Sequence, residues 1–351
     1  LKAPVGSCSA PSGSPSAPSP FRRGRAPVAP EMARRPPTKL GAAEIIRKAA
    51  QEVQLPPVHT ELLEAWLTSV FEPAAVDTST VLGAALAISA DLSCLRASVA
   101  TAVAPAARLS RQLLAQCGMQ VDGWCEADAM ANMAIECRSH KVELWIAFSH
   151  IGSSSPKADV GYFVRGRIAW LLADIWVPQN TDQDALRAHC QSIPGLAAPA
   201  NNVASPSALG GSLFPASGSA KPRRRSIEFE SSFDTPSKGI AFGLGFFKAL
   251  GFEKPSDDLV KALTQSRPSR CTAQVIMGEE GALEMAAGFS STTKTALKDV
   301  ARCIGFPIKS EALDRIWELA GAGYESAAIL QIVANAAGVI PTVGFRLLVA
   351  K

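Results

Sequence analysis

Cysteine and histidine side chains form the pattern in this sequence that comes nearest to a metal site. The four candidates are Cys117, Cys125, Cys137 and His140. Zinc prefers thiolate and imidazole ligands, but this spacing matches no known zinc loop, and on helices the four side chains need not converge. We therefore predict buried thiols and neither a metal nor a cofactor. The eight cysteines are dispersed and include no Cys-x-x-Cys pair, which indicates a reducing compartment.

A thiol nucleophile with a histidine base is a second arrangement to consider. Cys137 or Cys190 could pair with His140, His150 or His189, but the sequence identifies no third group to orient the base. A helical enzyme with its site around Cys137, His140, His150 and Arg165 is kept as an alternative interpretation.

The glycine-rich segment 239–252, GIAFGLGFFKALGF, could cradle an anion on its backbone amides. It lacks both the Gly-Lys-Ser/Thr ending of a phosphate loop and the spacing of a dinucleotide fingerprint. Its phenylalanines favour a helix that docks on a core or a partner. The adjacent acids at 257–258 and 279–280 diverge on a helix, and the basic run 221–226 is typical of a solvated segment, so we predict no catalytic residue.

The amino-acid composition and net charge argue against two classes of protein, nucleic-acid-binding proteins and membrane-spanning proteins. The 351 residues are 47% hydrophobic and 19% charged, which is enough for two or three domains with real cores. A net charge of +4 is too small and too scattered for the basic face of a nucleic-acid-binding protein. Residues 326–345 carry no charge, but Gln331, Asn335 and Pro341 interrupt them, so we expect a buried helix and a turn there instead of a membrane span.

Low-complexity stretches divide the chain. Residues 1–38 are rich in proline and basic residues and predict a disordered leader, which is either a transit peptide or a stretch upstream of a true start at Met32. Residues 191–238 are rich in Pro, Gly and Ser and predict a linker. The boundaries define an N-terminal helical domain, 39–190, and a C-terminal helical domain, 239–351.

Apolar periodicity predicts an all-α fold for both domains, because apolar residues recur at helical spacing and alternating runs are nearly absent. Residues 142–148, VELWIAF, are the one ambiguous segment. Three stretches fit the helical template in each domain, which predicts a three-helix module used twice. The stretches contain Ile46, Ala49, Ala50, Val53; Leu63, Trp66, Leu67, Val70; Val81, Ala84, Ala85, Ile88; Leu297, Val300, Ala301, Ile304; Leu313, Ile316, Trp317, Ala320; and Ile329, Ile332, Val333, Ala336.

Residues 296–334 resemble the core of the MOZART family of mitotic-spindle organising proteins. The matching positions are Arg302, Glu311, Leu313, Leu319, Gly323, the pair 328–329 and the pair 332–333. Gly321 and the pair 326–327 depart from the family pattern, which usually has an acid and then Pro-Glu there. Residues 55–76 are weakly similar to a second branch of the family. The resemblance implies a module that binds helical extensions of gamma-tubulin complex proteins at microtubule-organising centres.

The combined interpretation is a non-enzymatic helical adaptor or scaffold that binds partner helices, without nucleic acid or membrane. We expect a cytoplasmic location at a microtubule-organising centre, or an organellar one if residues 1–38 are a transit peptide. A lineage-specific helical subunit of an organellar complex is the alternative within this class. The expected partner-binding residues are Leu63, Trp66, Leu313, Ile316, Trp317, Gly323, Ile329 and Val333.

Overall fold

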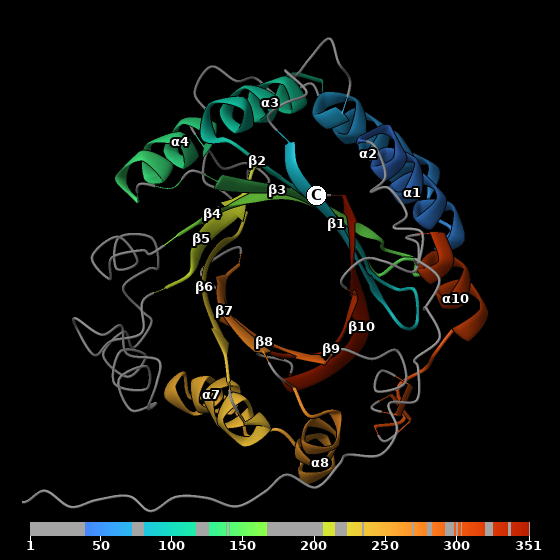
Figure 1. The fold of residues 1–351 in the computed structure, drawn as a ribbon, viewed down its shortest axis with the longest axis vertical. Coiled ribbons are helices and arrows are strands. Elements are labelled where there is room, and N and C mark those ends of the chain that lie inside the picture. The colour runs from blue at the N-terminus through green and yellow to red at the C-terminus, as the bar shows by residue number, and fades with distance from the viewer. Residues whose placement is uncertain are drawn as a thin grey trace, which may run out of the picture. The chain divides into compact units, whose positions relative to one another are not determined.

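A closed antiparallel β-barrel forms the centre of the computed structural model, and helices lie around its outer side (Figure 1). The structure describes residues 39–71, 81–116, 126–137, 139, 141–166, 206–214, 223–233, 235–268, 270–278, 283–291, 298–299, 301–302, 304–319, 326–335 and 338–350. Residues from Pro36 to Lys351 belong to one compact unit.

Within the described residues, ten strands build the barrel, and each pairs with its neighbours in the order β1-β10-β9-β8-β7-β6-β5-β4-β3-β2. Pairing of β1 with β10 closes the ring. The strands are β1 Val81–Ser89, β2 Leu95–Thr101, β3 Lys141–Ser149, β4 Lys157–Arg165, β5 Ala208–Ser212, β6 Arg225–Ser232, β7 Arg270–Met277, β8 Leu283–Ser291, β9 Ser326–Asn335 and β10 Gly338–Ala350.

Helices precede the strand hairpins along the chain. The pairs α1-α2, α3-α4 and α7-α8 come before β1-β2, β3-β4 and β7-β8, and α10 comes before β9-β10. The bounds are α1 Lys39–Glu52, α2 Pro57–Phe71, α3 Val103–Gln116, α4 Glu126–Glu136, α7 Pro236–Ala249, α8 Asp257–Ser266 and α10 Ser310–Leu319. The helices that recur in this order form a layer outside the strands (Figure 1).

The main hydrophobic core lies between the barrel wall and the helices. On β3, Val142, Leu144, Ile146 and Phe148 are all buried and belong to this core. Because successive strand residues point to opposite faces, the residues between them point into the barrel. The same alternation on β4 sends Val160, Tyr162 and Val164 outward. The wall is therefore apolar on its helix-covered side.

Helix α7 shows how the glycine-rich segment is used. Phe242, Phe246 and Phe247 are almost fully buried in the outer core, and α7 packs against β7 and β8. Gly243 permits this approach, because a Cβ there would lie 2.5 Å from the Phe289 ring. The segment is a helix docked on the chain's own core, which was one of the two roles expected for it.

The predicted all-α fold is wrong, and the third predicted helix of each module shows why. Helices α1, α2 and α10 exist, but the third segments are strands β1 and β9. In β1 the outward residues Ala84, Leu86 and Ile88 alternate with Gly83, Ala85 and Ala87, which are also small or apolar. A strand that is apolar on both faces shows no alternation, and its alanines favour a helical interpretation.

The prediction of two helical domains joined by a disordered linker is wrong for the same reason. Strands β1 to β4 and β7 to β10 come from opposite sides of the expected linker, yet they form one barrel. Strands β5 and β6 lie within 191–238 and hydrogen-bond to each other. Residues 326–345, the one membrane-span candidate, form β9 and part of β10. Among the described residues, no helix has the length and apolarity to cross a membrane.

Candidate functional site

The face of the barrel wall that points inward carries charged and aromatic side chains. Residues directly opposite each other on antiparallel strands share a face. Glu143 of β3 lies opposite Phe163 of β4, and Arg165 of β4 lies opposite Ala208 of β5, which in turn lies opposite Glu228 of β6. Trp145, Phe163 and Ala208 form a small cluster of their own, separate from the outer core. These residues therefore belong to the barrel interior.

Glu143 is the centre of an ion-pair network that we call the arginine cluster, made of Arg96, Glu143, Arg165, Glu228 and Arg346. Arg165 donates from Nε to Glu143 Oε2 at 2.7 Å and from Nη1 to Glu228 Oε1 at 2.6 Å. Arg96 and Arg346 each bring Nη2 to 3.9 Å from Glu143 Oε1. Three guanidiniums thus share two carboxylates, which leaves one positive charge in excess.

Electrostatics distinguishes the members of the arginine cluster. Burial alone raises the pKa of Glu143, but Arg165, Arg96 and Arg346 outweigh it and hold that pKa at about 2. Burial lowers the pKa of Arg96 to about 10, although Glu143 opposes the shift. Burial also disfavours charge on Arg165, yet Glu228 and Glu143 raise its pKa overall. Glu143 is ionised and Arg165 is tightly bound, whereas Arg96 is incompletely neutralised.

Two of the arginines retain hydrogen-bonding capacity toward a ligand. A distance of 3.9 Å is too long for a hydrogen bond, so Arg96 and Arg346 meet Glu143 only through charge attraction. Their side chains are 34% and 48% exposed, so water reaches this part of the barrel interior. Planar guanidiniums recognise phosphate and carboxylate groups in a bidentate manner. The cluster has the chemistry of an anion site.

Aromatic rings lie next to the arginine cluster. Trp145 and Phe163 have ring centroids 6.3 Å apart, and the Arg96 guanidinium lies 4.9 Å and 5.2 Å from their respective centroids. Glycines make room for both rings: a Cβ at Gly161 would lie 2.3 Å from the Trp145 ring, and one at Gly210 would lie 2.4 Å from the Phe163 ring. The interior therefore combines a cationic region with a flat apolar wall.

Asp159 is a further carboxylate on the same face, and it lies two residues before Gly161 on β4. Its Oδ2 accepts a 2.8 Å hydrogen bond from Ser212 Oγ. Burial raises the pKa of Asp159, and Ser212, Arg224 and Arg223 only partly offset that effect. Oδ1 of Asp159 and Nε1 of Trp145 are both buried, and neither has a hydrogen-bond partner within the described part of the chain.

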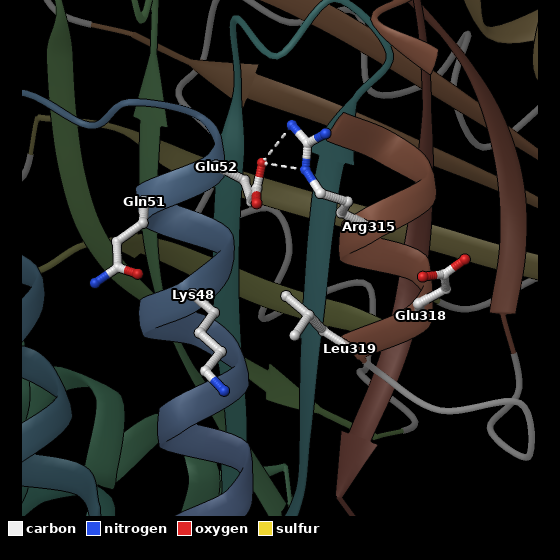
Figure 2. Close-up of a pocket in the computed structure, with 6 residues that line it drawn as sticks. All are labelled: Lys48, Gln51, Glu52, Arg315, Glu318 and Leu319. Atoms are coloured by element: carbon white, nitrogen blue, oxygen red, sulfur yellow. Dashed lines mark hydrogen bonds and ion pairs between the residues drawn. The ribbon is translucent and has the colours of Figure 1, made fainter. Parts of the chain in front are cut away.

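A depression outside the barrel lies between α1 and α10 (Figure 2). It has a volume of about 480 Å³ and is lined by Lys48, Gln51, Glu52, Arg315, Glu318 and Leu319. Arg315 reaches from α10 to Glu52 at the end of α1, with Nε and Nη2 both 2.9 Å from Oε2. Arg315 is exposed, and no buried polar group converges on the depression, so we assign it to the packing of α1 against α10.

The residues expected to bind partners are distributed between helices and a strand. Leu63 and Trp66 on α2, and Leu313 and Ile316 on α10, are buried in the outer core, and Trp317 packs against it. Ile329 and Val333 lie on β9, not on a helix, and Gly323 lies outside the described residues. The apolar faces of α2 and α10 thus cover the chain's own barrel.

The residues considered for a metal or a thiol site are not brought together by the described structure. Cys137 follows α4, His150 is exposed in the turn between β3 and β4, and Arg165 points into the barrel. Burial and the neighbouring Glu136 raise the pKa of the Cys137 thiol. Cys117, Cys125, His140, His189 and Cys190 lie outside the described residues. Within the described ranges, no three His, Cys, Asp or Glu side chains are placed to hold a metal.

Sequence reasoning missed most of the interior site, namely Arg96, Glu143, Trp145, Asp159 and Arg346. One usable signal was present in the ambiguous segment 142–148, because Glu143 stands in an otherwise apolar run. A charge within an apolar strand points to an inner face with a charge partner. The partners come from β2, β4, β6 and β10, which periodicity alone could not bring together.

Comparisons with known proteins identify the fold. No protein-family model and no curated protein matches the chain. The crystal structure of 6-dimethylallyltryptophan synthase from Micromonospora olivasterospora, in complex with DMASPP and Trp, is similar at a TM-score of 0.55 and 10% identity, over 89% of this chain and 96% of that one. A second structure, named 6-dimethylallyl tryptophan synthase, has a TM-score of 0.55 and 11% identity over 88% and 94% of the chains. AnaPT from Neosartorya fischeri has a TM-score of 0.51 and 9% identity over 87% and 91%.

These matches overturn the prediction of a non-enzymatic helical adaptor in a gamma-tubulin complex. The chain has the barrel fold of these solved structures, and this fold differs from any helical bundle. The helical faces that were expected to receive partner helices instead pack on strands. At such low identity, the similarity extends to the fold and not to individual residues.

Proposed function

We propose that this chain is a transferase that moves a prenyl group from an allylic diphosphate to an aromatic acceptor inside the barrel. The arginine cluster carries this proposal, because it joins an excess of positive charge to aromatic side chains on one inward face. A barrel of the same fold in 6-dimethylallyltryptophan synthase is named in complex with DMASPP and Trp, and supports this class of substrates.

The proposed reaction uses both halves of the site. The bond between the allylic carbon and the diphosphate oxygen breaks, and the electron pair leaves with the diphosphate. A carbon of the acceptor ring forms a new bond to the allylic carbon, and the ring then loses a proton to an oxygen of the released diphosphate. Arg96 and Arg346 stabilise the negative charge that develops on the leaving diphosphate. Trp145 and Phe163 offer apolar faces against which the prenyl group and the acceptor can lie.

Glu143 and Arg165 have a positioning role in this scheme. Glu143 is 6% exposed and is held by Arg165, so it stays ionised and keeps Arg96 and Arg346 near the same point. Their long separations from Glu143 allow them to turn to a diphosphate without breaking a short ion pair. Glu228 fixes Arg165 from the other side.

The test is to supply dimethylallyl diphosphate with a panel of aromatic acceptors, tryptophan included, and to detect prenylated product by mass spectrometry. Binding of inorganic pyrophosphate is measured in parallel by calorimetry. Arg346→Gln should weaken pyrophosphate binding about tenfold to a hundredfold, because it removes a charge-assisted contact. Arg302→Gln, a matched control at an exposed residue outside the barrel, should not change it. Failure of pyrophosphate to bind the wild-type protein would contradict the proposal.

A further inference from the structure

Two buried polar atoms of the barrel interior are left unused by the proposed transfer. They are Nε1 of Trp145, a donor, and Oδ1 of Asp159, an acceptor. A buried donor or acceptor without a partner costs about 1–3 kcal/mol, so such groups are rare in native proteins. Each therefore indicates either a destabilising defect or a place where a ligand completes the hydrogen bond.

The two atoms belong to one patch of the barrel wall. Trp145 lies directly opposite Gly161, and Ala147, two residues further along β3, lies opposite Asp159. Asp159 and Trp145 thus occupy diagonal positions on the same face of neighbouring strands, a separation that long side chains span. The Trp145 ring lies over Gly161, two residues from Asp159 on β4.

The surroundings hold both side chains in place. Ser212 Oγ donates to Oδ2 of Asp159, and Oδ1 of that carboxyl group has no hydrogen-bond partner among the described residues. The Trp145 ring is fixed between the Arg96 guanidinium and the backbone of Gly161. A donor and an acceptor that are positioned in advance recognise a ligand at a low entropic cost. Ser212 is engaged with Oδ2, and Arg223 and Arg224 act on Asp159 through charge attraction.

We propose that Trp145 and Asp159 form a polar subsite that binds a neutral hydroxyl or carboxamide group on the aromatic acceptor. The group accepts a hydrogen bond from Trp145 Nε1–H and donates one to Asp159 Oδ1. An ether or a ketone offers only an acceptor, and a bare hydrocarbon offers neither. This inference rests on the proposed function, because it takes the barrel interior to be the acceptor's binding site.

Three naphthalene ligands of one shape test the subsite: naphthol, naphthamide and methoxynaphthalene. The wild-type protein should bind naphthol or naphthamide about tenfold more tightly than methoxynaphthalene, because the ether cannot satisfy Asp159. Trp145→Phe keeps an aromatic ring and removes the donor, so it should weaken binding of all three ligands alike, because each of them accepts a hydrogen bond from Nε1–H. Asp159→Leu keeps the approximate volume and removes the acceptor, so it should reduce the preference to about twofold or less, with little change for methoxynaphthalene.

Matched controls separate the subsite from general effects on folding. Trp317→Phe changes a tryptophan on α10, outside the barrel, and Asp299→Leu changes an exposed carboxylate that pairs with Arg302. Both should keep the wild-type preference, and thermal unfolding of every variant verifies that it is folded. A preference that survives unchanged in folded Asp159→Leu, or an unchanged affinity for all three ligands in folded Trp145→Phe, would overturn the inference.

Pyrophosphate binding distinguishes failure of the subsite from failure of the proposed function. If pyrophosphate binds and the ligands show no preference, the subsite is wrong and the transferase proposal stands. If neither pyrophosphate nor any naphthalene ligand binds, both proposals are wrong. If the ligands bind with the expected preference but pyrophosphate does not, the interior is an aromatic-ligand site without the proposed donor.

Discussion

Glu143 is the residue on which the charges of the barrel interior depend. It is buried, and it faces Arg165, Arg96 and Arg346 from three different strands. Removing one partner of a buried ion pair costs about 3–5 kcal/mol, because the remaining charge stays buried without compensation. A single carboxylate therefore stabilises the fold and also sets the charge of the proposed donor site.

Glu143→Gln should lower the free energy of unfolding by about 3–5 kcal/mol at neutral pH. The native pKa of about 2 lies below the ordinary value of 4.5, so the stabilisation is present above 4.5 and is lost as the pH falls from there toward 2. Urea unfolding at neutral and at acidic pH should show the difference between wild type and variant shrinking in acid. An equal difference at both pH values would contradict this role.

Substituting Asp159 should change the free energy of unfolding in the opposite direction to substituting Glu143. Burial raises its pKa, so the native state favours the protonated form and loses that advantage as the pH rises through the native pKa. Asp159→Asn should therefore raise the free energy of unfolding by about 1 kcal/mol at neutral pH, with a smaller gain in acid. Thermal unfolding of wild type and variant at neutral pH and in acid measures the effect. A destabilised variant at neutral pH would show that Asp159 has a structural role instead.

At the scale of the elements, the close packing of strand β4 against β5 and the Trp145 ring requires a glycine at position 161. A Cβ at position 161 would lie 2.3 Å from the Gly211 carbonyl oxygen on β5 and equally close to the Trp145 ring. Gly161→Ala should cost about 1–3 kcal/mol, because the two strands must move apart or the ring must leave its place. Gly166→Ala is the matched control, since a Cβ there would meet its nearest neighbour, Cys137 O, only at 3.9 Å. Equal stability of the two variants in denaturant unfolding would contradict this explanation.

Whether an element could be predicted from the sequence depended on how its apolar residues are distributed over its faces. Helices α1, α2 and α10 could be predicted because each has one apolar and one polar face, as with Ile46 and Arg47 on α1. Strands β1 and β9 could not, because small or apolar residues occupy both faces and imitate helical spacing. The interior site was harder still to predict from the sequence, because Arg96, Glu143 and Arg346 become neighbours only through the strand order of the closed barrel.

At the scale of the whole molecule, the barrel makes the two halves of the chain interdependent. Strand β1 pairs with β10, and β4 pairs with β5, which lies within the segment 191–238. Residues 39–190 and 206–351 expressed separately should each lack a cooperative unfolding transition, because each half would expose two unpaired strand edges. Circular dichroism melting of each fragment and of their mixture measures this. Cooperative melting of either fragment alone would contradict it.

The β1–β10 seam also has a consequence for how fast the protein folds. It pairs residues 84–89 with residues 344–350, so the contacts that complete the ring join residues 255 to 266 positions apart in the sequence. Contacts between residues distant in sequence carry a large loop-closure entropy before they contribute any stability, and folding rates fall as such contacts increase. We therefore expect slow folding in which the hairpins form early and the ring closes late. Substitutions at Ile88 should then speed unfolding much more than they slow folding.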